Sequence, residues 1–139
     1  MNPVLRNILA VVAGFAIGSI VNISLVSVGP KVFPPPPGAD ITTMEGLKAT
    51  MHLFKPENFI FPFLAHALGT FAGAVVAALI AIGNKRRAAM IVSVLFLAGG
   101  IANVFMLPSP MWFNAVDLLF AYLPMGWLAV RLTASRQKA

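Results

Sequence analysis

The sequence predicts an all-α integral membrane protein, built as a four-helix antiparallel bundle with one external amphipathic helix at the membrane interface. Three observations predict this fold: an apolar composition, four long apolar runs, and basic residues that gather at the ends of those runs. Of the 139 residues, 59% are hydrophobic and 10% are charged, and the mean hydropathy is +0.88. Soluble domains carry about 25% charged residues, so this composition excludes an ordinary soluble enzyme. We expect a single membrane domain over residues 1–139.

Four apolar runs are long enough to cross a bilayer, which takes about 20 residues in a helix. They cover residues 8–29, 59–83, 88–107 and 112–130. The first three contain no Asp, Glu, Lys or Arg, and the fourth contains only Asp117. The first run also invites comparison with a signal peptide, but at 22 residues it exceeds the usual apolar core of about 7–15 residues, which favours an uncleaved helix.

The charges predict how the chain is oriented. Seven Lys and Arg residues lie before the first run, between the second and third, and after the fourth: Arg6, Lys85, Arg86, Arg87, Arg131, Arg136 and Lys138. The loop at 30–58 instead balances three Lys against three acids. Short basic loops stay in the cytoplasm. We therefore expect a multi-pass protein of the bacterial inner (cytoplasmic) membrane, with both termini in the cytoplasm and the 30–58 loop outside.

Small residues predict which helices meet. Because helices in lipid associate through close backbone contact, small side chains at every fourth position mark an interface. The first run has Ala10, Gly14 and Gly18 at this spacing, and the second has Ala65, Gly69, Gly73, Ala77 and Ala81. We expect these two faces to pack together, and a homo-oligomer interface is the alternative. In the fourth run, Pro124 removes a backbone hydrogen bond to Phe120 and predicts a kink.

The external loop carries its own predicted helix, at about 43–55. It follows a stiff run of four prolines at 34–37, and Thr42 and Glu45 have the spacing of a capping box. Its apolar residues share one face, which can lie in the lipid interface or cap the mouth of the bundle. In the second case Met51 and His52 are the candidate lid residues.

Strong polar side chains within the four runs are few. They are Asn22, His66, Asn103, Asn114 and Asp117. Counted from the external ends at about 1.5 Å per residue, each of the four helices places one such residue at a similar depth in the outer half. We treat these residues as candidates for ligand or proton binding. The alternative is a hydrogen-bonded network that only fixes how the helices pack.

His66 and Asp117 form the most informative pair in this layer. An ionisable residue inside a membrane is costly and needs a partner. We therefore predict that the two side chains meet in the bundle interior, directly or through one water or Asn. A His–Asp pair can share a proton and change its charge near neutral pH.

Several chemistries are disfavoured by the sequence. The chain has no Cys, which excludes disulfides and thiolate metal sites. No spacing of His and acidic residues indicates a metal site, and no nucleophile or phosphate-loop motif appears, so we expect no metal and no cofactor. The basic residues are few and scattered, so we expect no nucleic-acid partner.

The predicted function is that of a small, non-enzymatic membrane protein. It would bind a hydrophobic, lipid-like ligand or serve as an accessory subunit of a larger membrane complex, with membrane lipids as partners. Two alternatives stay open. One is a proton-coupled transporter or channel protomer that works as a homo-oligomer. The other is a membrane enzyme that acts on a lipid or isoprenoid at the external interface, with His66 and Asp117 as an acid–base pair.

Overall fold

The computed structural model describes residues 1–136, and the regular secondary structure in this part of the chain is entirely helical. Its elements are α1 (Pro3–Val32), α2 (Met44–Thr50), η1 (Met51–Leu53), η2 (Pro56–Phe59), α3 (Ile60–Ile80), α4 (Lys85–Met106), α5 (Met111–Phe120) and α6 (Leu123–Arg136). Four helical segments are long and apolar enough to cross a membrane: Pro3–Val32, Pro56–Ile80, Lys85–Met106 and Met111–Ser135. The chain is therefore a multi-pass membrane protein. Lys138, one of the residues that predicted the orientation, lies outside the described residues.

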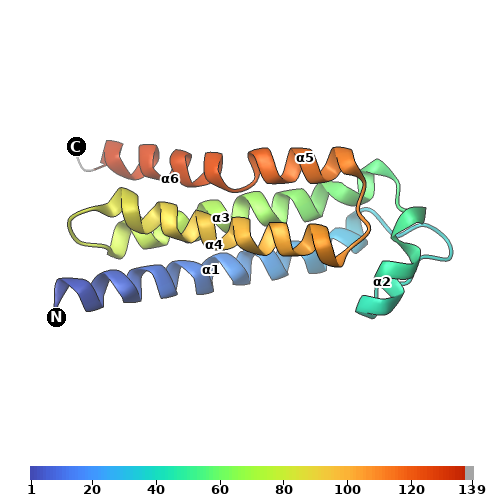
Figure 1. Ribbon diagram of the computed structural model, residues 1–139, viewed down its shortest axis with the longest axis horizontal. Coiled ribbons are helices and arrows are strands. Elements are labelled where there is room, and N and C mark those ends of the chain that lie inside the picture. The colour runs from blue at the N-terminus through green and yellow to red at the C-terminus, as the bar shows by residue number, and fades with distance from the viewer. Residues whose placement is uncertain (137–139) are drawn as a thin grey trace.

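The long helices lie side by side, with α3 in the middle (Figure 1). α3 packs against α1, α4 and α6. The start of α1 and the end of α6 are at one end of the molecule, and α2 is at the other. α3 owes its central place to its small residues, because eight of its residues are buried and seven of these are Ala or Gly.

The predicted seam between the first two long helices is confirmed. A Cβ atom placed on Gly14 would lie 2.5 Å from the carbonyl oxygen of Gly73, and one on Gly18 would lie 2.5 Å from that of Gly69. The two backbones touch because these positions carry no side chain. The seam is thus used within one chain, between α1 and α3.

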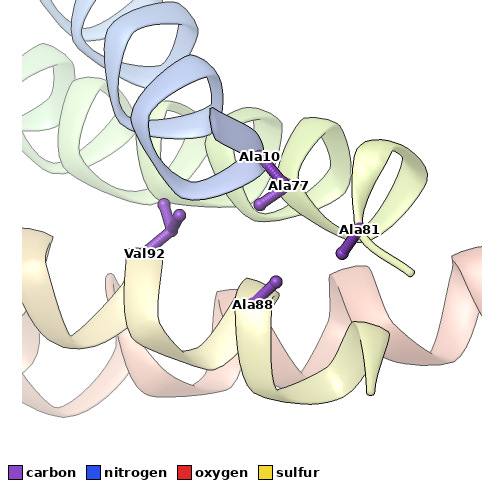
Figure 2. Close-up of a cluster of buried hydrophobic side chains, with 5 residues drawn as sticks. All are labelled: Ala10, Ala77, Ala81, Ala88 and Val92. Atoms are coloured by element: carbon purple, nitrogen blue, oxygen red, sulfur yellow. The ribbon is translucent and has the colours of Figure 1, made fainter. Parts of the chain in front are cut away.

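Nearer the chain termini, α4 joins α1 and α3 in a cluster of small buried side chains. Figure 2 shows residues from α1, α3 and α4 pointing toward one another. They are Ala10, Ala77, Ala81, Ala88 and Val92, and all are buried. Small side chains on three helices let the helices approach closely, which supplies dispersion contacts in place of a hydrophobic driving force.

α1 begins five residues before the predicted span, and its first turn holds the end of α3. Asn2 caps the helix by accepting a hydrogen bond from the backbone of Val4 at 2.8 Å, and Pro3 occupies the first helical position, which suits its fixed φ. One turn later, the Arg6 guanidinium donates to the carbonyl oxygen of Ile80 at 2.8 Å. Asn7 exchanges two hydrogen bonds with the backbone of Ile82, at 2.8 and 3.1 Å. These contacts satisfy backbone groups that the end of a helix leaves free.

The fourth predicted span is two helices. α5 ends at Phe120 and α6 begins at Leu123, because Pro124 has no N–H to offer the carbonyl oxygen of Phe120. The predicted kink is confirmed as a full break in the helix. Gly126 lets α6 approach α4 closely, since a Cβ atom there would collide with the Ser93 side chain.

The segment between α1 and α3 departs from its prediction in two ways. The cap of α2 is Thr43, whose hydroxyl accepts from the backbone N–H of Gly46 at 2.9 Å, and not Thr42. The Thr42 hydroxyl instead donates to Asp40 at 2.6 Å, and this bond together with the Thr42 backbone N–H lowers the pKa of the Asp40 carboxyl. The helix is also shorter than 43–55. It ends where the Thr50 hydroxyl accepts from the Asp40 backbone N–H at 2.8 Å, and η1 follows.

Candidate functional site

A cavity of about 700 Å³ lies at the α2 end of the bundle, within the range of about 300–1,000 Å³ that is usual for small-molecule sites. α1, α3, α4, α5 and the segment that contains α2 all contribute to its wall, which is mostly apolar. All five polar residues that the sequence singled out line it: Asn22, His66, Asn103, Asn114 and Asp117. The structure therefore brings the predicted polar layer together around one space.

His66 and Asp117 are in direct contact, as predicted. Nδ1 of His66, on α3, lies 2.8 Å from Oδ1 of Asp117, on α5. A carboxylate only accepts hydrogen bonds, so Nδ1 carries the proton of this bond. The side chain of Asp117 is 6% exposed, whereas that of His66 is 15% exposed. The imidazole is therefore the more accessible member of the pair.

Tyr122 completes the network, although no sequence pattern pointed to it. Its hydroxyl donates to Oδ2 of Asp117 at 2.8 Å, and its ring stacks on that of His66 with a centroid distance of 5.8 Å. In an unbroken helix, position i+5 would point away from Asp117. The break before Leu123 removes this restriction. The sequence contains one hint of this contact. The single Tyr of the chain lies two residues before Pro124, in the predicted span whose one acidic residue is Asp117.

Two neighbours make this network possible. Gly100 on α4 leaves room for Tyr122, since a Cβ atom there would collide with the phenol ring and its hydroxyl. Thr70 is fully buried one turn from His66, and its hydroxyl donates to the His66 carbonyl oxygen at 2.7 Å. Tyr122 itself is 1% exposed. The base of the cavity is thus closed by packed side chains with satisfied polar atoms.

The three amides have different surroundings. Asn114 is tied to the link between α4 and α5, because its Oδ1 accepts from the Ser109 hydroxyl at 2.6 Å. Asn22 and Asn103 face the cavity from α1 and α4, and within residues 1–136 neither side chain has a hydrogen-bond partner. Asn103 is exposed, and Asn22 is accessible as well, since the buried side-chain nitrogen and oxygen atoms of the partly or fully buried described residues all have partners.

On the side nearest α2, the cavity is lined by aromatic residues and by Met51, one of the two lid candidates. Met51 is buried against Phe59 and Phe113, whose rings are 4.8 Å apart. His52 is exposed and does not line the cavity. Two residues of opposite charge, Lys31 and Glu57, lie exposed at the rim.

Comparison of the chain with known protein families, curated proteins and solved structures gives no match. The function must therefore be inferred from the geometry of the site. Within residues 1–136, no three His, Asp or Glu side chains gather as metal ligands would. The five polar residues Asn22, His66, Asn103, Asn114 and Asp117 form the part of the cavity that we call its floor. The rest of the cavity wall is mostly apolar.

Proposed function

We propose that this protein binds a lipid-like ligand in the cavity between its membrane-spanning helices. The ligand's polar head would contact His66 and the neighbouring amides, and its apolar part would lie along the aromatic wall. The observation that carries this proposal is the combination, in one cavity of about 700 Å³, of mostly apolar walls and the buried His66–Asp117 pair. Binding sites for small molecules typically combine apolar walls with a few convergent polar groups.

The proposed setting is an antiparallel bundle in the inner membrane, with the ends of α1 and α6 in the cytoplasm. Arg6 is in the first turn of α1, the 85–87 cluster is at the start of α4, and Arg131 is in α6. These parts of the chain lie at the end of the molecule opposite α2 (Figure 1). This distribution supports the orientation that the positive-inside rule predicts. The cavity then opens in the outer half of the membrane, beneath α2.

α2 is proposed to cover the cavity as a lid. Leu47 and Met51 line the cavity from this segment, and both pack in the cluster around Phe59 and Phe113. An interfacial helix with no role in the site would instead turn its apolar face to lipid. The contacts of Met51 support the lid.

The packing between the cavity and the end of the molecule that holds the termini supports ligand binding over transport across the membrane. Between the cavity and the terminal ends, α3 packs against α1, α4 and α6 through clusters of small buried side chains. One cluster joins Ala10 of α1 to Ala77 of α3, and another joins Ala74 to Ala129 of α6. A transport path would have to open these contacts.

A pair of variants on α4 tests the proposal. Val104 lines the cavity, whereas Ile101 is exposed and does not. After purification in mild detergent, lipids bound to the wild-type protein, Val104→Trp and Ile101→Trp are extracted and measured by mass spectrometry. We expect a bound lipid in the wild type and in Ile101→Trp, and its loss in Val104→Trp, because the indole occupies part of the cavity that the lipid would use. Equal lipid content in the two variants would refute the cavity as the binding site.

A further inference from the structure

We infer that the ligand's head group is uncharged and oxygen-bearing, such as the hydroxyl of a long-chain or isoprenoid alcohol. This inference rests on the proposed function and deepens it by naming the ligand class. It follows from the charges of the floor, the free nitrogen of His66, and the amides around it.

The floor of the cavity offers no fixed positive charge. The two ionisable residues there are His66 and Asp117, whereas the cationic lining residue, Lys31, is exposed, as is the acidic lining residue Glu57. With Asp117 ionised, the pair carries a charge of −1 or zero. A phosphate or carboxylate head would lose its hydration and gain no cation in return, which is unfavourable at low dielectric.

A cationic head is disfavoured for a different reason. Both oxygens of Asp117 are already engaged, Oδ1 by His66 and Oδ2 by Tyr122. His66 is also the more exposed member of the pair. An ammonium group would therefore meet the imidazole before the carboxylate, and only the remaining lone pair of each carboxylate oxygen would be left to accept its N–H groups.

An uncharged oxygen fits the groups that remain free. His66 uses Nδ1 for Asp117, and within residues 1–136 its Nε2 has no partner. Because no buried nitrogen of the described chain lacks a partner, Nε2 must be accessible, and His66 lines the cavity. With the proton on Nδ1, Nε2 accepts a hydrogen bond from a hydroxyl group. Asn22 and Asn103 line the same cavity, and their amide groups can donate hydrogen bonds to the oxygen of such a hydroxyl group.

The test keeps the ligand's tail constant and varies its head. Binding of labelled farnesol to the detergent-purified protein is measured, with unlabelled farnesol, farnesyl phosphate and farnesylamine as competitors at pH 7.5. We expect farnesol to compete about tenfold better than either charged compound, because a charged head group would be left buried without a matching partner. Preferred binding of the phosphate or the amine would overturn the inference.

Two variants of His66 separate recognition from stability. His66→Gln keeps a polar group near the position of Nε2, whereas His66→Asn keeps one near Nδ1 and leaves the ligand's hydroxyl without a partner. We expect His66→Gln to retain most farnesol binding and His66→Asn to lose about tenfold. If both variants bind farnesol like the wild type, Nε2 does not hold the head group.

A variant of Asp117 tests the role of charge. Asp117→Asn removes the negative charge and keeps the shape of the side chain. We expect the selectivity for farnesol over farnesyl phosphate to fall in this variant, whatever its overall affinity. An unchanged ratio would contradict the role given to the Asp117 charge.

Failure of the inference and failure of the proposed function are distinguishable. If a charged farnesyl compound binds best and Val104→Trp abolishes that binding, the cavity stands as the site and only the head-group class is wrong. If no farnesyl compound binds and Val104→Trp and Ile101→Trp carry equal lipid, the proposed function itself is wrong.

Discussion

The Tyr122 hydroxyl donates a hydrogen bond to Oδ2 of Asp117 across the break between α5 and α6, at 2.8 Å. The bond uses the oxygen of Asp117 that His66 leaves free. A buried carboxylate is costly unless its lone pairs are satisfied. The break in the fourth span therefore lowers the cost of burying Asp117, because it allows Tyr122, which follows α5, to donate a hydrogen bond to the carboxylate.

Tyr122→Phe removes this hydroxyl without changing the ring. We expect it to lower the free energy of unfolding by about 1–3 kcal/mol, because Oδ2 loses its partner in a buried site. Thermal unfolding in detergent measures the effect. Ser24→Ala is the control, since the Ser24 hydroxyl is exposed and bonds only to its own helix, at the carbonyl oxygen of Ile20. Equal stability of Tyr122→Phe and the wild type would show that the bond contributes nothing.

Neighbouring glycines on α4 offer a matched pair. A Cβ atom on Gly100 would collide with the Tyr122 ring, whereas one on Gly99 would meet nothing within 4 Å. We expect Gly100→Ala to destabilise the protein by about 1–3 kcal/mol through overpacking, and Gly99→Ala to be neutral or slightly stabilising in the same thermal assay. The smaller side chain of Tyr122→Leu should partly rescue Gly100→Ala. Absence of any difference between the two alanine variants would contradict the packing of Tyr122 against α4.

The seam between α1 and α3 predicts a stronger effect. Gly69→Leu or Gly73→Leu should separate the two helices and abolish a cooperative thermal transition, because a Cβ atom would lie 2.8 Å from a backbone carbonyl oxygen of α1 at Gly69 and 2.5 Å from one at Gly73. Gly99→Leu is the control, as its side chain would enter open space. Gly83, although nothing crowds it, is unsuitable as a control because its φ of +76° strains any other residue. Cooperative unfolding of Gly73→Leu near the wild-type temperature would refute the seam.

The orientation in the membrane can be tested by thiol labelling, because the chain has no native Cys. Lys48 on α2 and Arg86 at the start of α4 are both exposed. In intact cells, we expect a membrane-impermeant maleimide to label Lys48→Cys and to leave Arg86→Cys unlabelled until the membrane is opened. The reverse pattern would mean that the termini lie outside.

Much of the architecture follows from local sequence patterns. Apolar runs of a certain length predict membrane helices, and small residues at every fourth position predict which faces meet, so both the spans and the seam of Gly14, Gly18, Gly69 and Gly73 could be derived. The contact between His66 and Asp117 could also be derived, because two costly groups at similar depth have few other partners.

The sequence by itself thus determined the membrane-spanning segments, the seam between the first two of them and one polar pair. Only the tertiary structure decided that Tyr122 joins the pair, that Gly100 makes room for it, and that Arg6 binds the end of α3. It also decided that Met51, and not His52, reaches the cavity. The physical reason is one of range. Periodicity and length act within a helix, whereas contacts between helices depend on how far each one rotates, bends and breaks, and small differences in these angles change which side chains meet.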